Sequence, residues 1–342
     1  METKKLNISM RFILKIPISL FFLFIYSCDN TPEKESEKSN SQEKVYIQVP
    51  KFNQDSAYAY IKKQVDYGPR FISSKGWENC FLWLEKKLSN YADTVIINSA
   101  KVTTYDGKIH RLKNIVASFS PNKKNRVALF AHWDTRHIAD YDTINKDMPI
   151  LGANDGGSGV GVLLECARQF KINQPNIGVD IILFDAEDYG DPNSNDPTSW
   201  CLGSQHWAKN PHQKNYKARY GVLLDMVGGK DATFYQEGYS VKYADNIVQK
   251  FWRKANNLGY SKYFKNKLGW KLGYLTDDHV FVNEITLNKG RHIRTINIIE
   301  YDINNEQKFN KHWHTHQDNM LNIDKKTLKV VGQTLLEILY YE

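Results

Sequence analysis

The chain has 342 residues, of which 41% are hydrophobic and 25% are charged, and its formal net charge is +8. A chain of this length and composition can bury a substantial core, which excludes a fibrous or wholly disordered protein. Its basic residues are spread along the chain without a basic helix or a run of interleaved aromatic residues. We therefore expect a solvated charged surface and no binding of nucleic acid.

Residues 1–27 have the layout of an export signal. Four basic residues precede the apolar run 16–26, which is too short to span a membrane comfortably. The run ends in Ile25-Tyr26-Ser27-Cys28, which resembles the lipobox of bacterial lipoproteins, whose Cys is lipidated and becomes the mature N-terminus. The alternative is an ordinary cleaved signal peptide with an incidental Cys at position 28.

Residues 28–44 contain no large apolar side chain and mix Glu, Lys, Ser and Asn. Such a segment cannot bury enough surface to fold, so we expect a disordered tether that begins at the lipidated Cys28. The folded domain would then comprise residues 45–342. These features predict an exported protein that its lipid holds on the bacterial cell envelope, at the periplasmic or the cell-surface face.

Beyond the tether, the hydrophobic pattern predicts alternating helices and strands. The expected helices are 54–67, 77–91, 159–170, 241–257 and 325–341, and the expected strands are 95–98, 114–119, 127–131, 179–184, 220–224 and 293–299. Several of these strands are apolar without alternation, which is typical of strands that are buried on both faces. The alternation predicts an α/β domain whose central sheet is covered by helices on both sides.

Polar residues follow three of these apolar runs. His132 follows residues 127–131, Glu187 and Asp188 follow residues 179–184, and Asp225 follows residues 222–224. In an open α/β sheet, ligands bind beyond the carboxyl ends of the strands, so we expect these side chains to converge on one site. Asp155, in a glycine-rich turn that leads into a helix, adds a further carboxylate.

These residue types favour a catalytic metal. Catalytic zinc sites use imidazoles and carboxylates and leave one position open, whereas structural zinc is usually held by a closed set that is rich in Cys. Asp134, two residues after His132, could orient a metal ligand. The adjacent acids Glu187 and Asp188 are unfavourable together unless a cation or a proton compensates them, which suggests one metal ligand and one proton carrier.

The ordered set resembles the glutaminyl cyclase branch of the zinc exopeptidase superfamily, in particular its bacterial, Bacteroidetes-type members. The resemblance extends from about residue 50 to the C-terminus and rests on the segments His132-Trp-Asp134, Gly152-Ala-Asn-Asp155, Phe184-Asp-Ala-Glu-Asp188, Cys201-Leu-Gly-Ser-Gln-His206, Leu224-Asp225-Met-Val-Gly228, Asp277-Asp278-His279 and Trp313-His314-Thr315. It implies one zinc-dependent catalytic domain with a mixed, largely parallel central sheet flanked by helices.

The resemblance also implies a role for each matching residue. Asp155, Asp188 and His314 would hold one zinc ion, although animal members have Glu at the position of Asp188. Glu187 would be the general acid and base. Hydrogen bonds to the reacting groups or to Glu187 would come from Asp225 and Asp277. Trp313 matches a wall of the substrate pocket, and Trp200 could replace a pocket Trp that animal members carry soon after the acidic pair.

The implied reaction converts the N-terminal glutamine of peptides or proteins to pyroglutamate and releases ammonia. The alternative is an aminopeptidase with two zinc ions, in which His132 and Asp225 complete a second metal site and Asp155 bridges the two ions. A third possibility, a non-catalytic surface-binding lipoprotein, is disfavoured because every implied zinc ligand and Glu187 are present.

Overall fold

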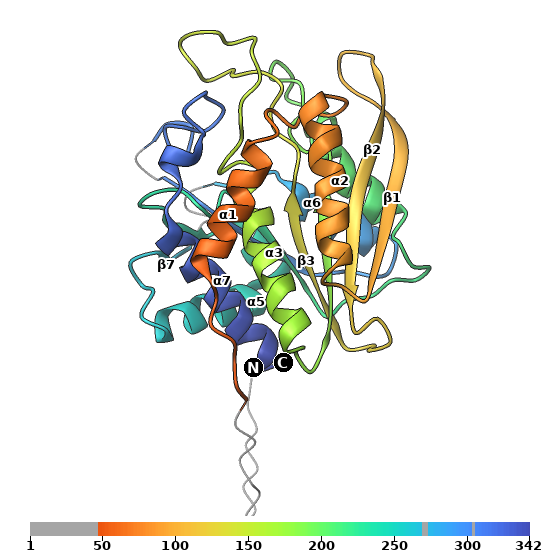
Figure 1. The fold of residues 1–342 in the computed structure, drawn as a ribbon, viewed down its shortest axis with the longest axis vertical. Helices are drawn as coiled ribbons and strands as arrows, with labels where there is room; N and C mark the ends of the chain where they lie inside the picture. The colour runs from red at the N-terminus through yellow and green to blue at the C-terminus, as the bar shows by residue number, and fades with distance from the viewer. Residues whose placement is uncertain (1–46, 269–272, 303–304) are drawn as a thin grey trace, which may run out of the picture. The chain divides into compact units, whose positions relative to one another are not determined.

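The structure is a computed structural model that describes residues 47–342 except 269–272 and 303–304 (Figure 1). These residues form one compact unit. The predicted signal and tether, residues 1–44, lie outside the described residues. Among the described helices, none combines the length and the apolar character that a membrane crossing requires.

A six-stranded sheet forms the centre of the unit. Its strands lie in the order β1-β2-β4-β3-β5-β8. The four neighbouring strands β4, β3, β5 and β8 pair in parallel. Strand β2 pairs antiparallel with both β4 and β1. This arrangement confirms the expected mixed, largely parallel sheet. The strands are β1 (Thr94–Thr103), β2 (Ile109–Phe119), β3 (Arg126–His132), β4 (Gly178–Phe184), β5 (Gly221–Asp225) and β8 (Thr295–Ile299).

Helices cover both faces of this sheet. The larger core joins one face to α1 (Gln54–Val65), α2 (Lys75–Ser89), α3 (Gly157–Ile172), α5 (Gly238–Asn257) and α7 (Lys325–Tyr340). On the other face, α4 (Leu202–Lys209) and α6 (Asp278–Asn288) enclose a smaller core. In Figure 1, α1 and α3 lie beside one another, as their packing requires. The predicted two-sided cover is therefore confirmed.

Side-chain alternation explains how each strand serves both cores. In β3, Leu129 packs into the larger core and Phe130 into the smaller one, because successive side chains of a strand point to opposite faces. Both positions are apolar and fully buried. This is why the strand lacks a polar alternation in its sequence.

The helices begin at capping residues. The Asn53 side chain accepts hydrogen bonds from the N–H groups of Asp55 and Ser56, and Ser74 accepts one from Trp77. The cap at Ser74 starts α2 at Lys75, two residues before the expected start. The described residues also include a second, two-stranded sheet of β6 (Phe234–Gln236) and β7 (Phe264–Leu268), and short 3-10 turns at Pro197–Ser199 and Met320–Asn322.

The start of α3 packs directly on the end of β5. A Cβ atom at Gly159 would lie only 2.2 Å from the carbonyl oxygen of Leu224. Glycine therefore lets the helix backbone approach the strand end. This contact brings the turn that carries Asp155 close to Asp225.

Candidate metal centre and pocket

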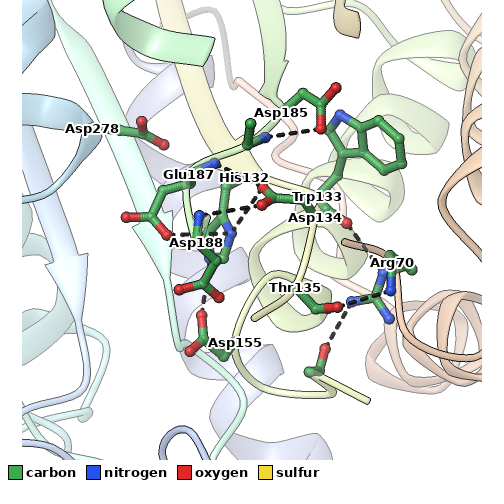
Figure 2. A network of polar contacts seen from close by, with 12 residues as sticks. Arg70, His132, Trp133, Asp134, Thr135, Asp155, Asp185, Glu187, Asp188 and Asp278 are labelled. Atoms are coloured by element: carbon green, nitrogen blue, oxygen red, sulfur yellow. Dashed lines mark hydrogen bonds and ion pairs between the residues drawn. The ribbon is translucent and has the colours of Figure 1, made fainter. Parts of the chain in front are cut away.

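The carboxyl ends of β3, β4 and β5 carry four of the sequence-predicted site residues. His132 and Asp225 are the last residues of β3 and β5, while Glu187 and Asp188 follow a turn after β4. In this turn Ala186 has a φ of 53°, in the left-handed region. Figure 2 shows Glu187, Asp188 and Asp155 gathered around His132. The structure thus brings together residues that are up to 93 positions apart.

Asp185 fixes the turn that presents the acidic pair. Its carboxylate accepts hydrogen bonds from the indole N–H of Trp77 at 2.8 Å and from the backbone N–H groups of Lys113 at 2.7 Å and Ala186 at 2.8 Å. A buried carboxylate with three donors is well satisfied. These hydrogen bonds anchor the turn to α2 through Trp77 and to β2 through Lys113.

Asp134 holds the backbone of the acidic pair. Its two carboxylate oxygens accept the N–H groups of Glu187 at 3.1 Å and of Asp188 at 3.2 Å (Figure 2). Asp134 also lies 3.6 Å from Nδ1 of His132. It is fully buried, so these contacts take place away from solvent.

Asp155, Asp188 and His314 form a compact triad. Their potential ligand atoms all lie within 4.8 Å of one another. Nε2 of His314 is 3.2 Å from Asp188 and 3.6 Å from Asp155. One buried oxygen of Asp155 and one of Asp188 have no hydrogen-bond partner among the described residues. Buried carboxylate oxygens without partners are costly unless a cation compensates them, so these three residues fit a zinc ion.

The electrostatics of the triad separate its two acids. Burial opposes ionisation of Asp188, but the charge of His314 outweighs burial and lowers the pKa of Asp188 to about 2. Burial and then the charge of Asp188 raise the pKa of Asp155 to about 7. In His314, burial lowers the pKa, but the charge of Asp188 overcomes this and raises it to about 9. A divalent cation at this place would stabilise both carboxylates.

A second triad shares Asp155. Nε2 of His132 lies 3.1 Å from Asp155 and 3.1 Å from Asp225, and the three residues offer ligand atoms within 4.8 Å of one another. Burial disfavours the imidazolium of His132, but Asp134, Asp155 and Asp225 outweigh burial and hold its pKa well above 6.5. The geometry therefore permits either a hydrogen-bonded His132 or a second metal ion.

Glu187 lies near both triads and near a further carboxyl group, that of Asp277. Burial, followed by the charge of Asp188, raises the pKa of Glu187 well above its usual value. The neighbouring Asp277 caps α6, and Asn297 donates a hydrogen bond to it at 2.5 Å. Burial and the charge of Asp225 raise the pKa of Asp277 to about 7. Both groups thus favour the protonated form more than a free carboxyl group does.

These residues form one end of a pocket of about 340 Å³. Asp155, Glu187, Asp188, Asp225, Asp277 and His314 line it together with the aromatic residues Trp200, Tyr274, Phe309 and Trp313. The ring of Trp313 stacks on His314 with 3.9 Å between the centroids. Trp133, in contrast, is fully buried and packs in the core against Trp77. Trp200 and Trp313 therefore both line the pocket, beside the acidic groups.

Several supporting residues escaped the sequence analysis. Asp140 lies 3.0 Å from Nδ1 of His314 and also binds Arg136 at 2.9 Å. The buried guanidinium of Arg136 stacks over Trp200 and donates to the carbonyl oxygens of Asp188 and Gly190. Both residues belong to the long loop after β3, whose length is the only sequence signal of a role at the site.

Two further contacts hold the loops in place. Asp318 accepts the N–H groups of Asn154 at 2.7 Å and Asp155 at 3.0 Å. The fully buried Arg70 donates to the carbonyl oxygen of Trp133, and both residues are labelled in Figure 2. It also donates to the carbonyl oxygens of Leu151 and Gly152. No local pattern could reveal these contacts, because their partners are distant in the sequence.

Comparisons with known proteins agree with this geometry. The model of peptidase family M28 matches residues 114–339. The Bacteroides thetaiotaomicron glutaminyl cyclase structure is 48% identical, with a TM-score of 0.82, and the match covers 86% of this chain and all of that one. A structure from the same organism, described as a leucine aminopeptidase precursor, is 47% identical with a TM-score of 0.81 and covers 86% of this chain and 99% of its own.

Among curated proteins, the chain is similar to the glutaminyl-peptide cyclotransferase of Bos taurus. The two are 25% identical over 265 residues, which is 66% of either chain. The alignment thus spans just under two thirds of the bovine protein. The family model covers more than half of the present chain, and on that ground the chain belongs to peptidase family M28.

Proposed function

We propose that this protein is a zinc-dependent glutaminyl cyclase, which converts the N-terminal glutamine of peptides and proteins to pyroglutamate. The observation that carries the proposal is the pocket of about 340 Å³, in which a triad suited to one zinc ion stands beside Glu187 and between aromatic walls. Such a pocket suits one flexible side chain held against the reacting groups. The similarity to a solved bacterial glutaminyl cyclase supports the same assignment.

The substrate glutamine enters the pocket between Trp200 and Trp313, with its γ-amide toward Asp155, Asp188 and His314. Zinc held by these three residues would supply Lewis acidity that polarises the γ-carbonyl group. The aromatic walls exclude water and keep the side chain folded back on its own α-amine. Holding the amine near the amide carbon provides much of the acceleration, because the reaction is intramolecular.

Glu187 moves the proton. It accepts a proton from the α-amine while the amine nitrogen forms its bond to the amide carbon. It then delivers that proton to the amide nitrogen, which leaves as ammonia when the carbon–nitrogen bond breaks. The pKa of Glu187 is raised by burial, and a raised pKa suits a carboxylate that both accepts and returns a proton. Asp225 and Asp277, which line the same pocket, accept hydrogen bonds from the α-amine or the leaving nitrogen.

A direct assay tests the proposal. The purified protein is incubated with Gln-peptides and, separately, with Ala- and Leu-peptides, and ammonia and free amino acids are followed. We expect ammonia and a product lighter by one NH₃ from the Gln-peptides alone. Release of free amino acid from the Leu-peptides would instead identify an aminopeptidase.

The aminopeptidase is kept as a second candidate because His132, Asp155 and Asp225 also form a triad. In that enzyme, two ions would share Asp155 and activate a water molecule for hydrolysis of the first peptide bond. In the cyclase, Nε2 of His132 instead makes a hydrogen bond to Asp225. Metal analysis separates the two: one zinc per chain agrees with the cyclase, and two agree with the peptidase.

We also propose that the enzyme is exported and anchored by a lipid on Cys28 to the bacterial cell envelope. The support is the basic and apolar layout of residues 1–27, the lipobox-like segment before Cys28 and the polar composition of residues 28–44. Cys28→Ser should move the protein from the membrane fraction to the soluble fraction and abolish labelling by a fatty-acid analogue. Unchanged membrane association would refute the lipid anchor.

A further inference from the structure

We propose that Cys201 is a positioning residue whose thiol orients the carboxylate of Glu187. The inference rests on the proposed function, since it assigns Glu187 the proton transfer. Sγ of Cys201 donates a hydrogen bond to Oε1 of Glu187 at 3.2 Å. Cys201 begins the segment Cys201-Leu-Gly-Ser-Gln-His206, and the resemblance to the family implies no role for its thiol.

The thiol is the main polar contact of this carboxylate. Among the described residues, the nearest cationic group to the Glu187 carboxylate is His132, whose Nδ1 lies 3.8 Å from Oε2, too far for a hydrogen bond. Asp134 holds the backbone N–H of Glu187 but not its side chain. In the described part of the chain, the thiol is therefore the side-chain donor that holds this carboxylate.

Cys201 is itself held firmly. Its backbone N–H donates to the carbonyl oxygen of Glu187 at 2.9 Å, and the next residue, Leu202, donates to Ala186 at 3.0 Å. Cys201 adopts a left-handed φ of 56° and is the residue directly before α4. The turn that carries Ala186 and Glu187 is thus tied to the start of α4 by two backbone bonds and one side-chain bond.

Cys201 acts through Glu187 and not on the substrate. It is buried and does not line the pocket. Its Sγ lies within 4.8 Å of oxygens of Glu187 and Asp277, the two acids assigned to proton handling and hydrogen bonding. Burial and the nearby charge of Glu187 raise the pKa of the thiol well above 9, so the group stays a donor.

A thiol is a weak hydrogen-bond donor, and at this position its contact sets the direction of the Glu187 carboxylate. A hydroxyl at the same place would keep a donor facing Oε1.

Two substitutions separate orientation from packing. Cys201→Ala removes the donor, and we expect kcat to fall about five- to tenfold, the loss of one modest hydrogen bond in the transition state, with KM and zinc content unchanged. Cys201→Ser replaces the thiol by a hydroxyl, which also donates one hydrogen bond, and should recover part of the kcat that Cys201→Ala loses. Cys166→Ala removes another buried thiol, in α3, and should leave kcat unchanged.

A wild-type kcat in Cys201→Ala, or a kcat for Cys201→Ser no higher than that of Cys201→Ala, would overturn the inference. So would a fall in kcat/KM that arises from KM alone, because that would place Cys201 in substrate binding. If the wild-type protein releases no ammonia from Gln-peptides, the proposed function fails instead.

Infrared spectroscopy tests the contact without activity. The S–H stretching band of Cys201 is the one that disappears in Cys201→Ser. Glu187→Gln replaces a charged acceptor by a weaker amide oxygen, so this band should shift to higher wavenumber in that variant. A band that does not move would show that the thiol does not donate to Glu187.

Discussion

Glu187 and Asp188 are adjacent acids in very different surroundings. His314 lies 3.2 Å from Asp188 and lowers its pKa to about 2. Glu187 has no cationic partner at hydrogen-bond distance within the described part of the chain, and its buried position raises its pKa. One residue is thus disposed to stay ionised against a metal, and the other to exchange a proton. Glu187 and Asp188 differ in role because only Asp188 contacts His314.

This difference predicts the behaviour of Glu187→Gln. The amide keeps the size of the side chain but cannot carry a proton, so kcat should fall by about 10²- to 10⁴-fold, the usual contribution of a general acid and base. The zinc content should not change, because Asp155, Asp188 and His314 are untouched. Steady-state assays and metal analysis of the same preparation check both points. More than a tenth of the wild-type activity in this variant would remove Glu187 from its role.

Asp140 gives a second prediction at this scale. It contacts Nδ1 of His314 at 3.0 Å, on the side of the ring opposite the triad. Carboxylates in this position orient a ligating imidazole and increase its basicity. Asp140→Asn should therefore weaken zinc binding about 10- to 100-fold, as measured by competition with a chelator.

Asp142→Asn is the matched control for this substitution. It lies two residues along the same loop, but its carboxylate binds His316 instead of His314. It should keep the wild-type zinc affinity. Equal affinities for the two variants would show that Asp140 does not support the ligand.

The sequence could reveal residues at strand ends but not their supports. His132, Asp225, Glu187 and Asp188 each follow an apolar run, so the pattern of one strand is enough to place them. Asp318 binds the N–H of Asn154, 164 residues away, and nothing near Asp318 in the sequence marks that contact. Resemblance to a family located His314, which follows no strand.

At the scale of elements, the amphipathic helices and the apolar strands of the main sheet were predictable, whereas helices α4 and α6 were not. The expected helices and strands of the main sheet all exist, with ends displaced by a few residues. Helix α4 has only eight residues, and α6 buries Asp278, His279 and Asn283 besides its apolar side chains. Neither helix presents the apolar stripe on which sequence reasoning depends.

The turn before α3 gives a prediction at this scale. Gly156 has a φ of 81°, and an added Cβ would lie 2.1 Å from the carbonyl oxygen of Asp134. Gly156→Ala should therefore both strain the backbone and push the turn away from Asp134. We expect a loss of about 2–4 kcal/mol in the free energy of unfolding and weaker zinc binding, because Asp155 precedes this glycine.

Gly259→Ala separates the backbone strain from the steric contact with Asp134. Gly259 has nearly the same φ, 83°, but a Cβ added to it would meet no heavy atom within 4 Å among the described residues. Its substitution should cost only the backbone term, about 1–2 kcal/mol, and leave zinc binding unchanged. Denaturant titration of both variants gives the comparison. Equal losses would mean that the turn yields without displacing Asp155.

At the scale of the whole molecule, this protein has a basic net charge but buries several carboxyl groups. The formal net charge is +8, yet Asp155, Asp277, Asp318 and Glu300 are all buried and have raised pKa values. Burial of these carboxyl groups therefore costs stability, because the folded state opposes ionisations that the unfolded chain allows. This cost should appear in the dependence of stability on pH.

Glu300 lets this cost be measured away from the zinc ligands. Burial raises its pKa from 4.5 to about 7, although Asn154 and Asn310 donate hydrogen bonds to it at 3.1 and 3.0 Å. Since the folded pKa is raised, the contribution of Glu300 to stability is fully present below pH 4.5 and is lost as the pH rises through about 7. The unfolded state ionises first over this window, so the free energy of unfolding falls.

Glu300→Gln should remove that fall, because the amide accepts the same two hydrogen bonds and cannot ionise. Relative to the wild type, the variant should gain stability between pH 4.5 and pH 7, by on the order of 3 kcal/mol at the upper end. Denaturation of both proteins in saturating zinc at each pH makes metal binding cancel in the difference. Glu306→Gln, an exposed carboxyl in the same segment, is the control and should leave the slope unchanged. A difference between wild type and Glu300→Gln that stays constant across the window would mean that Glu300 is not held protonated in the folded state.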